Sequence, residues 1–220
     1  MQAIDYIDAD IPYLKDTDTV QFALDVMAGN AITILPVVSN WSYLGLVEED
    51  FLLNIDNGNI PLGNFEFENA NIAVIDEQHV FELIQKMIET NTFSMPVLGA
   101  DKRYIGMANA ESVLRKLGNT SSLTDPGGMI VLQMNKNDYA LSEIARIVES
   151  NDALILNCYI SSNENISQIE VTLKISKADL NDVIASFERY EYTIKAAYHQ
   201  SSTREDLQHR YDSLMHYLNM

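Results

Sequence analysis

The chain has 220 residues, of which 47% are hydrophobic, and a formal net charge of −18. This length allows one or two domains with a buried core, and the apolar fraction excludes wholesale disorder. The acidity argues against nucleic-acid and membrane partners, because both are bound mainly through Lys and Arg. No apolar run approaches the ~18 residues that a membrane-spanning helix needs. The acidic first residues lack the basic region of a secretory signal, and the single cysteine fits a reducing compartment, so we expect a cytoplasmic protein.

An internal repeat organises the first half of the chain. The positions that align without a gap at an offset of 60 residues are Asp16, Val20, Met27, Pro36 and Val37 with Asp76, Val80, Met87, Pro96 and Val97. Gly45 aligns with Gly106 after a shift of one residue. Two copies are too few for a solenoid, so the repeat predicts two similar halves that face each other.

Each copy predicts the same order of elements. Capping residues at 16–19 and 76–79 precede an apolar stripe with helical spacing. A short apolar strand with Pro36 or Pro96 follows, and we expect it to be an edge strand or to end at the proline, because proline lacks the N–H that a ladder requires. A hairpin, a second strand and a short helix follow, the helices at 49–55 and 110–117.

The turn-rich stretch 118–128 predicts a domain boundary. Beyond it, strands are expected at 129–134, 153–161, 169–175 and 192–198. One helix is expected at the stripe of Leu141, Ile144, Ala145 and Val148, and another after Asp179. This β-α-β-β-α-β order predicts a ferredoxin-like antiparallel sheet with two helices on one face. A last helix is expected at 203–219, with an apolar seam at Leu207, Tyr211, Leu214 and Leu218 that packs either on its own domain or on a second subunit.

The repeated unit resembles the cystathionine β-synthase (CBS) domain, which occurs in tandem pairs called Bateman modules. The matching features are the helical stripe that ends at Met27 or Met87, the proline strand, and the glycine strand that leads into a helix. The region 129–198 resembles an ACT-type regulatory domain in its order of elements. The expected fold is therefore α+β, with CBS repeats at 1–60 and 61–120, an ACT-like domain at 127–198 and the C-terminal helix.

The resemblance implies an adenosyl site in the cleft between the repeats, with AMP, adenosine or S-adenosylmethionine as effector. The residues that it assigns to this site are Thr17, Thr19, Ile34, Pro36, Asp50, Thr92, Met95, Pro96, Asn109 and Ser112. It also implies an ACT-type amino-acid loop at Asn137, Asp138 and Ala140, although Asp138 is better explained as the N-cap of the next helix.

Both implied sites depart from the pattern of their families. The hydroxyl and Asp positions that hold phosphate and ribose carry Glu48 and Phe51 in the first copy, and Asn109 and Ser112 in the second. The acidic run at 48–50 would repel a polyphosphate, so ATP is disfavoured in the first site. In the ACT-like loop, Ala140 stands where a glycine is expected.

No P-loop, dinucleotide fingerprint, nucleophile elbow or zinc-protease motif occurs, and the histidines do not form a metal pair. We therefore expect a protein that is not an enzyme and holds no metal. The leading hypothesis is a homodimeric regulatory module that senses an adenosyl ligand. The alternative is a ligand-free interaction scaffold with degenerate CBS and ACT sites.

Overall fold

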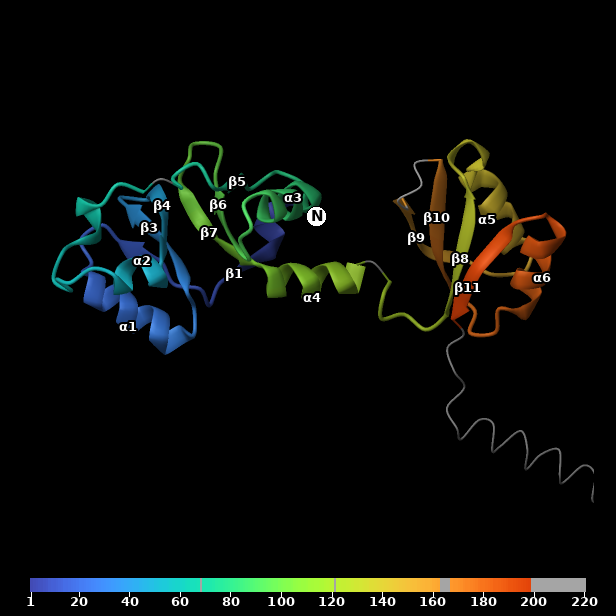
Figure 1. Cartoon of the computed structure of the whole chain (residues 1–220), viewed down its shortest axis with the longest axis horizontal. Helices are drawn as coiled ribbons and strands as arrows, with labels where there is room; N and C mark the ends of the chain where they lie inside the picture. The colour runs from blue at the N-terminus through green and yellow to red at the C-terminus, as the bar shows by residue number, and fades with distance from the viewer. Residues whose placement is uncertain (68, 121, 163–166, 199–220) are drawn as a thin grey trace, which may run out of the picture. The chain divides into compact units, whose positions relative to one another are not determined.

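The computed structural model describes residues 1–67, 69–120, 122–162 and 167–198 (Figure 1). Two compact units divide the chain, Met1–Leu117 and Gly118–Met220. The helix and apolar seam expected at 203–219 lie outside the described residues. Within the described ranges, no helix has both the length and the apolar character needed to cross a membrane.

The first repeat forms a three-stranded sheet with two helices. Its elements are β2 (Leu14–Lys15), α1 (Val20–Asn30), β3 (Ile34–Ser39), β4 (Ser42–Glu48) and α2 (Glu49–Leu53), and the sheet order is β2-β3-β4. The Thr19 hydroxyl caps α1 by accepting a hydrogen bond from the Phe22 N–H at 3.2 Å. Val20, Ala23 and Met27 are buried on the inner face of the helix, as the apolar stripe predicts.

The second repeat has the same elements and one strand more. They are β5 (Val74–Ile75), α3 (Val80–Glu89), β6 (Ser94–Leu98), β7 (Tyr104–Asn109) and α4 (Ala110–Thr120). The additional strand, β1 (Ile7–Asp8), comes from the start of the chain and follows the 3₁₀ helix η1 (Ala3–Tyr6). The sheet order is β1-β7-β6-β5, and Ala3 and Tyr6 are buried in this second core. The N-terminal segment therefore packs on the repeat that lies later in the sequence.

The prediction that each proline strand is an edge strand or ends at its proline is wrong, because β3 and β6 are interior strands of their sheets. Pro36 and Pro96 lie within β3 and β6, opposite Leu46 and Met107 of the antiparallel partner strands. The parallel partner β2 pairs with β3 only from Val37 onward. Pro36 therefore lies beyond the parallel ladder, where its missing N–H leaves no backbone acceptor unpaired.

The two repeats face each other through their hairpins, as the sequence repeat predicts. Val38, Leu98 and Tyr104 form a buried cluster that draws on both copies. At its rim, the Tyr104 N–H donates to the Trp41 carbonyl at 2.8 Å. The segment between the repeats includes the 3₁₀ helix η2 (Leu62–Asn64), whose Leu62 is buried in the core of the first repeat.

The C-terminal unit is ferredoxin-like and ACT-like, as expected. Its elements are β8 (Gly128–Asn135), the 3₁₀ helix η3 (Lys136–Asp138), α5 (Leu141–Glu149), β9 (Ile155–Ser162), β10 (Gln168–Ile175), α6 (Asn181–Arg189) and β11 (Thr193–Tyr198). All strand pairs are antiparallel, and the order is β11-β8-β10-β9. Helices α5 and α6 lie on one side of this sheet (Figure 1), and residues at every second position of β8 are buried beneath them.

Two details of this unit differ from expectation. Asp138 is not the N-cap of α5, because that helix begins after Ala140 and has no side-chain cap. Leu141 is exposed instead of facing the core, and Ile147 is buried on the inner face. The helix therefore starts later and is rotated relative to the stripe read from the sequence.

Candidate functional site

A cleft of about 500 Å³ opens between the two repeats. Equivalent segments of the two copies form opposite parts of its wall. The lining residues are Ala31, Ile32, Thr33, Ile34, Leu46, Glu48, Glu49, Asp50, Asn69, Ile72, Thr90, Asn91, Thr92, Phe93 and Ser94. The cleft is thus a product of the sequence duplication.

The same backbone conformation at the end of a helix positions both wall segments. The chain leaves α1 and α3 through left-handed residues, Ala31 at φ 54° and Asn91 at φ 49°. The next N–H groups, those of Ile32 and Thr92, each donate back to a helix carbonyl at 3.0 Å. This ending turns the chain sharply from each helix into the strand that follows, and so directs residues 31–34 and 91–94 to the cleft.

The acidic run enters the cleft because it starts α2. The Glu49 N–H donates to the Thr33 carbonyl at 2.8 Å, and the Ala110 N–H donates to the Phe93 carbonyl at the same distance in the second repeat. These bonds tie the start of each short helix to its wall segment. In the first repeat they hold the run at 48–50 against the opening.

A second hollow, of about 520 Å³, continues the cleft. Its lining residues are Leu46, Val47, Glu48, Phe51, Glu66, Phe67, Asn69, Asn71 and Ile72. Leu46, Glu48, Asn69 and Ile72 line both hollows. We call the two hollows together the inter-repeat cleft.

The inter-repeat cleft is acidic. Glu48, Glu49, Asp50 and Glu66 line it, whereas none of its lining residues is Lys, Arg or His. A cleft lined by one sign of charge concentrates ligands of the opposite sign. This arrangement suits a neutral or cationic ligand and opposes a phosphate.

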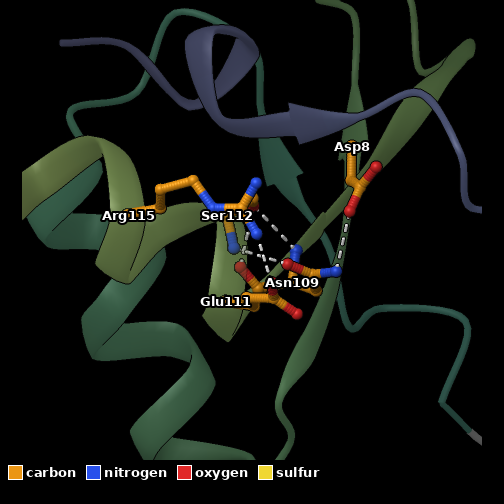
Figure 2. A network of polar contacts seen from close by, with 5 residues as sticks. All are labelled: Asp8, Asn109, Glu111, Ser112 and Arg115. Atoms are coloured by element: carbon orange, nitrogen blue, oxygen red, sulfur yellow. Dashed lines mark hydrogen bonds and ion pairs between the residues drawn. The ribbon is translucent and has the colours of Figure 1, made fainter.

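Another hollow, of about 380 Å³, lies at the start of α4 and is lined by Ile7, Asp8, Ala9, Asp10, Glu111, Ser112, Arg115 and Lys116. We call it the counterpart hollow, because α4 in the second repeat corresponds to α2, which carries the acidic run in the first. Figure 2 shows the polar network beside it. The Asn109 Oδ1 accepts from the Ser112 N–H at 2.6 Å, and the Asn109 Nδ2 donates to Asp8 at 3.0 Å. The Ser112 hydroxyl donates to the Tyr6 carbonyl at 2.7 Å.

Asn109 and Ser112 are thus already engaged in the structure. Together they cap the start of α4 and hold the N-terminal segment on the second sheet. Arg115 pairs with Glu111 one turn away (Figure 2). A ribose at this hollow would have to compete with these intramolecular partners.

The structure brings three of the residues implied by the resemblance into the inter-repeat cleft, namely Ile34, Asp50 and Thr92. Pro36, Met95 and Pro96 are buried within their strands. Thr17 lies exposed in the turn before α1, where Thr19 is the cap.

Sequence reasoning did not select Thr33, Ser94, Asn69 or Ile72, which line the cleft. Thr33 and Ser94 adjoin selected residues, so the repeat itself offered a signal for them. Asn69 and Ile72 lie in the connecting segment and had no such signal.

The loop residues implied for the ACT-like unit have local roles. Asp138 accepts from the Asn135 Nδ2 at 2.8 Å. Ala140 is extended, with φ −135° and ψ 98°, a conformation open to any residue. The backbone at this position therefore does not require glycine.

Two further observations concern reactive groups. Burial raises the pKa of the Cys158 thiol, which hydrogen-bonds with Tyr139, so little thiolate forms at neutral pH. Among the described residues, no group of three or more His, Cys, Asp or Glu side chains could hold a metal ion.

Comparison with known proteins identifies the N-terminal unit. A family model described as "CBS domain" matches residues 69–119. A CBS domain pair/ACT domain protein of Thermotoga maritima has a similar structure, at a TM-score of 0.50 and 18% identity, with 54% of this chain and 98% of that one covered. The second repeat thus matches the CBS domain model, and the N-terminal unit has the fold of a CBS domain pair.

Other solved structures are also similar to this chain. Protein MJ1004 of M. jannaschii has a TM-score of 0.50 and 23% identity over 56% of this chain and 62% of that chain. CBSX2 of Arabidopsis thaliana, solved in complex with AMP, has a TM-score of 0.48 and 21% identity over 54% of this chain and 96% of that one. The search of curated proteins gives no match. CBS domains are typically non-catalytic, and here the pair is only part of the chain.

Proposed function

We propose that the CBS pair is a non-catalytic sensor that binds a small adenosyl molecule in the inter-repeat cleft. The observation that supports this function is the cleft itself, which is built from equivalent segments of both repeats, 31–34 and 91–94. The hollow that these segments line has a volume of about 500 Å³, within the range of ~300–1,000 Å³ that is usual for small-molecule sites.

The charge of the cleft selects among adenosyl ligands. Adenosine is neutral and S-adenosylmethionine carries cationic groups, whereas AMP and ATP carry phosphate. With Glu48, Glu49 and Asp50 at the opening and no basic residue in the lining, the phosphate would meet only repulsion. We therefore place adenosine and S-adenosylmethionine above AMP, and AMP above ATP.

Ligand binding would act on the relative orientation of the two repeats. A molecule held by both wall segments favours the conformation in which those segments are correctly spaced. The hairpins meet at the Tyr104–Trp41 hydrogen bond, and Trp41 is the only tryptophan of the chain. Its fluorescence would therefore report a change at the contact between the repeats.

Thermal unfolding with a panel of adenosine, S-adenosylmethionine, AMP and ATP tests this function. A ligand at 100 times its Kd should add about 2.7 kcal/mol to the free energy of unfolding. The variant Thr33→Trp fills the cleft from an exposed wall position and should abolish the shift. The control Thr124→Trp adds the same bulk at an exposed position outside the cleft lining and should preserve the shift. Equal shifts in both variants would place the ligand elsewhere.

A ligand-free scaffold is the second candidate, and the engagement of Asn109 and Ser112 in local hydrogen bonds favours it. Flat unfolding curves across the panel would support this scaffold and overturn the sensor. In either case we propose a cytoplasmic homodimer in which the ACT-like unit provides the dimer contact, because β9 and β11 are the edge strands of its sheet among the described residues. Light scattering at micromolar concentration should give twice the chain mass of 24.8 kDa. A monomer mass would exclude this assembly.

A further inference from the structure

The connecting segment places one amide side chain in the wall shared by both hollows of the inter-repeat cleft. Asn69 lines each hollow, and its Oδ1 accepts a hydrogen bond from the Leu46 N–H at 3.1 Å. A backbone N–H can pair only with the oxygen of a carboxamide, so this bond determines which way the amide is turned. The Nδ2 group, the other terminal atom of the carboxamide, is therefore directed away from the Leu46 N–H.

The approach that makes this bond possible depends on Gly45. A Cβ at Gly45 would lie 2.3 Å from the Cβ of Phe67 and 3.3 Å from the Asn69 Oδ1. Only a residue without a side chain lets the connecting segment lie this close to β4. The close contact between the connecting segment and β4 thus holds the Asn69 side chain in one orientation.

The Asn69 amide nitrogen has two N–H donors and makes no hydrogen bond with the other described residues. The charged groups that share the lining are carboxylates, which only accept. Asn69 therefore supplies a side-chain hydrogen-bond donor of fixed orientation, whereas the charged side chains of the cleft can only accept hydrogen bonds.

We propose that Asn69 is a specificity-determining residue that donates a hydrogen bond from Nδ2 to an acceptor atom on the ligand. This inference rests on the proposed function. It narrows the ligand to a neutral or cationic molecule that presents a hydrogen-bond acceptor, such as a ring nitrogen of a purine nucleoside, toward the connecting segment. A site that donates to a ligand acceptor rejects analogues that lack it, because its buried donor is then left unpaired.

The test uses the full chain, with adenosine as the probe and titration calorimetry as the readout. Asn69→Asp keeps the oxygen that accepts from Leu46 but removes the donor. We expect about three- to tenfold weaker binding of adenosine, the usual effect of losing one hydrogen bond between neutral groups. Asn64→Asp is the matched control, because Asn64 is an exposed residue of the same connecting segment that does not line the cleft, and the substitution adds the same charge. This control should bind adenosine as the wild type does.

Deaza analogues of adenosine, each with one ring nitrogen replaced by C–H, complete a double-mutant cycle. One analogue should bind the wild type about three- to tenfold more weakly and should lose nothing further in Asn69→Asp. If the wild type binds adenosine, and Asn69→Asp binds it as well as the control Asn64→Asp does, the role of Asn69 is refuted and the sensor stands. If the wild type does not bind adenosine, both proposals fail. If Asn69→Asp does not fold, wild-type binding that is the same for every deaza analogue refutes the role of Asn69.

Discussion

We predict that the acidic lining of the inter-repeat cleft favours adenosine over AMP, and removing two of its carboxylates tests this preference. In the double variant Glu48→Gln, Glu49→Gln, the lining keeps its shape and loses two negative charges. A unit charge pair at ~6 Å is worth ~0.7 kcal/mol at the dielectric of water and ~2.8 kcal/mol at an effective dielectric of 20. Glu48 is exposed and Glu49 half-buried, so we take about 1 kcal/mol for each carboxylate.

The double variant should therefore bind AMP about 30-fold more tightly than the wild type, which corresponds to about 2 kcal/mol. The affinity for neutral adenosine should stay nearly constant, since neither lost charge acts on a formal charge of that ligand. Titration calorimetry with both ligands measures the ratio directly. Raising the salt concentration should reduce the difference between variant and wild type, because exposed charges are screened.

A matched control removes two charges from the counterpart hollow. Asp10→Asn with Glu111→Gln changes the net charge equally, and both residues line the hollow of the second repeat. This control should leave the ratio of AMP to adenosine affinity unchanged. The reasoning is refuted if the wild type binds AMP as tightly as adenosine, or if the control shifts the ratio as much as the cleft variant does.

Three further changes test the packing. Gly45→Ala should lower the free energy of unfolding by about 1–3 kcal/mol, because its Cβ would clash with Phe67. Gly29→Ala, in open space within α1, should raise the free energy of unfolding by about 0.5–1 kcal/mol. Chemical denaturation measures both changes, and changes of the same sign would contradict the prediction. Tyr6→Ala should lower the free energy of unfolding by about 3–5 kcal/mol, because this side chain is only 2% exposed. Amide hydrogen exchange should then increase first in β7. An increase confined to the first repeat would contradict the placement of the N-terminal segment. Burial raises the pKa of Tyr43 and of Tyr104, so their neutral forms stabilise the fold below pH ~10, and this contribution falls by about 1.4 kcal/mol per pH unit for each tyrosine as pH rises further. Tyr104→Phe should flatten the alkaline loss of stability, and an unchanged profile would show that the hydroxyl is hydrated.

The counterpart hollow shows how far residue types at matched positions can be interpreted. Asn109 and Ser112 stand where the resemblance places ribose contacts, and both are polar. The same residue types also cap helices, and at the start of α4 they do so, with Tyr6 and Asp8 as further partners. Those partners lie about a hundred residues earlier in the chain, so a local pattern could not reveal them.

The sequence by itself determined the duplication, the starts of α1 and α3, and the ferredoxin-like order of the second unit. These depend on short-range patterns, namely capping residues, apolar spacing and the alternation along β10, which act within a few residues. The acidic run at 48–50 and the adjoining Ile34 were also predictable as neighbours of a cleft.

Only the tertiary structure decided which polar residues meet in that cleft. It placed the first eight residues on the second sheet, carried Pro36 through the interior of a strand, and set Asn69 against the backbone of Leu46. Each of these outcomes depends on contacts between segments distant in sequence. The missing N–H of Pro36 and the missing Cβ of Gly45 have consequences only when another segment packs against them. The chain therefore encodes its two repeats locally, and the chemistry of the cleft between them arises when they pack.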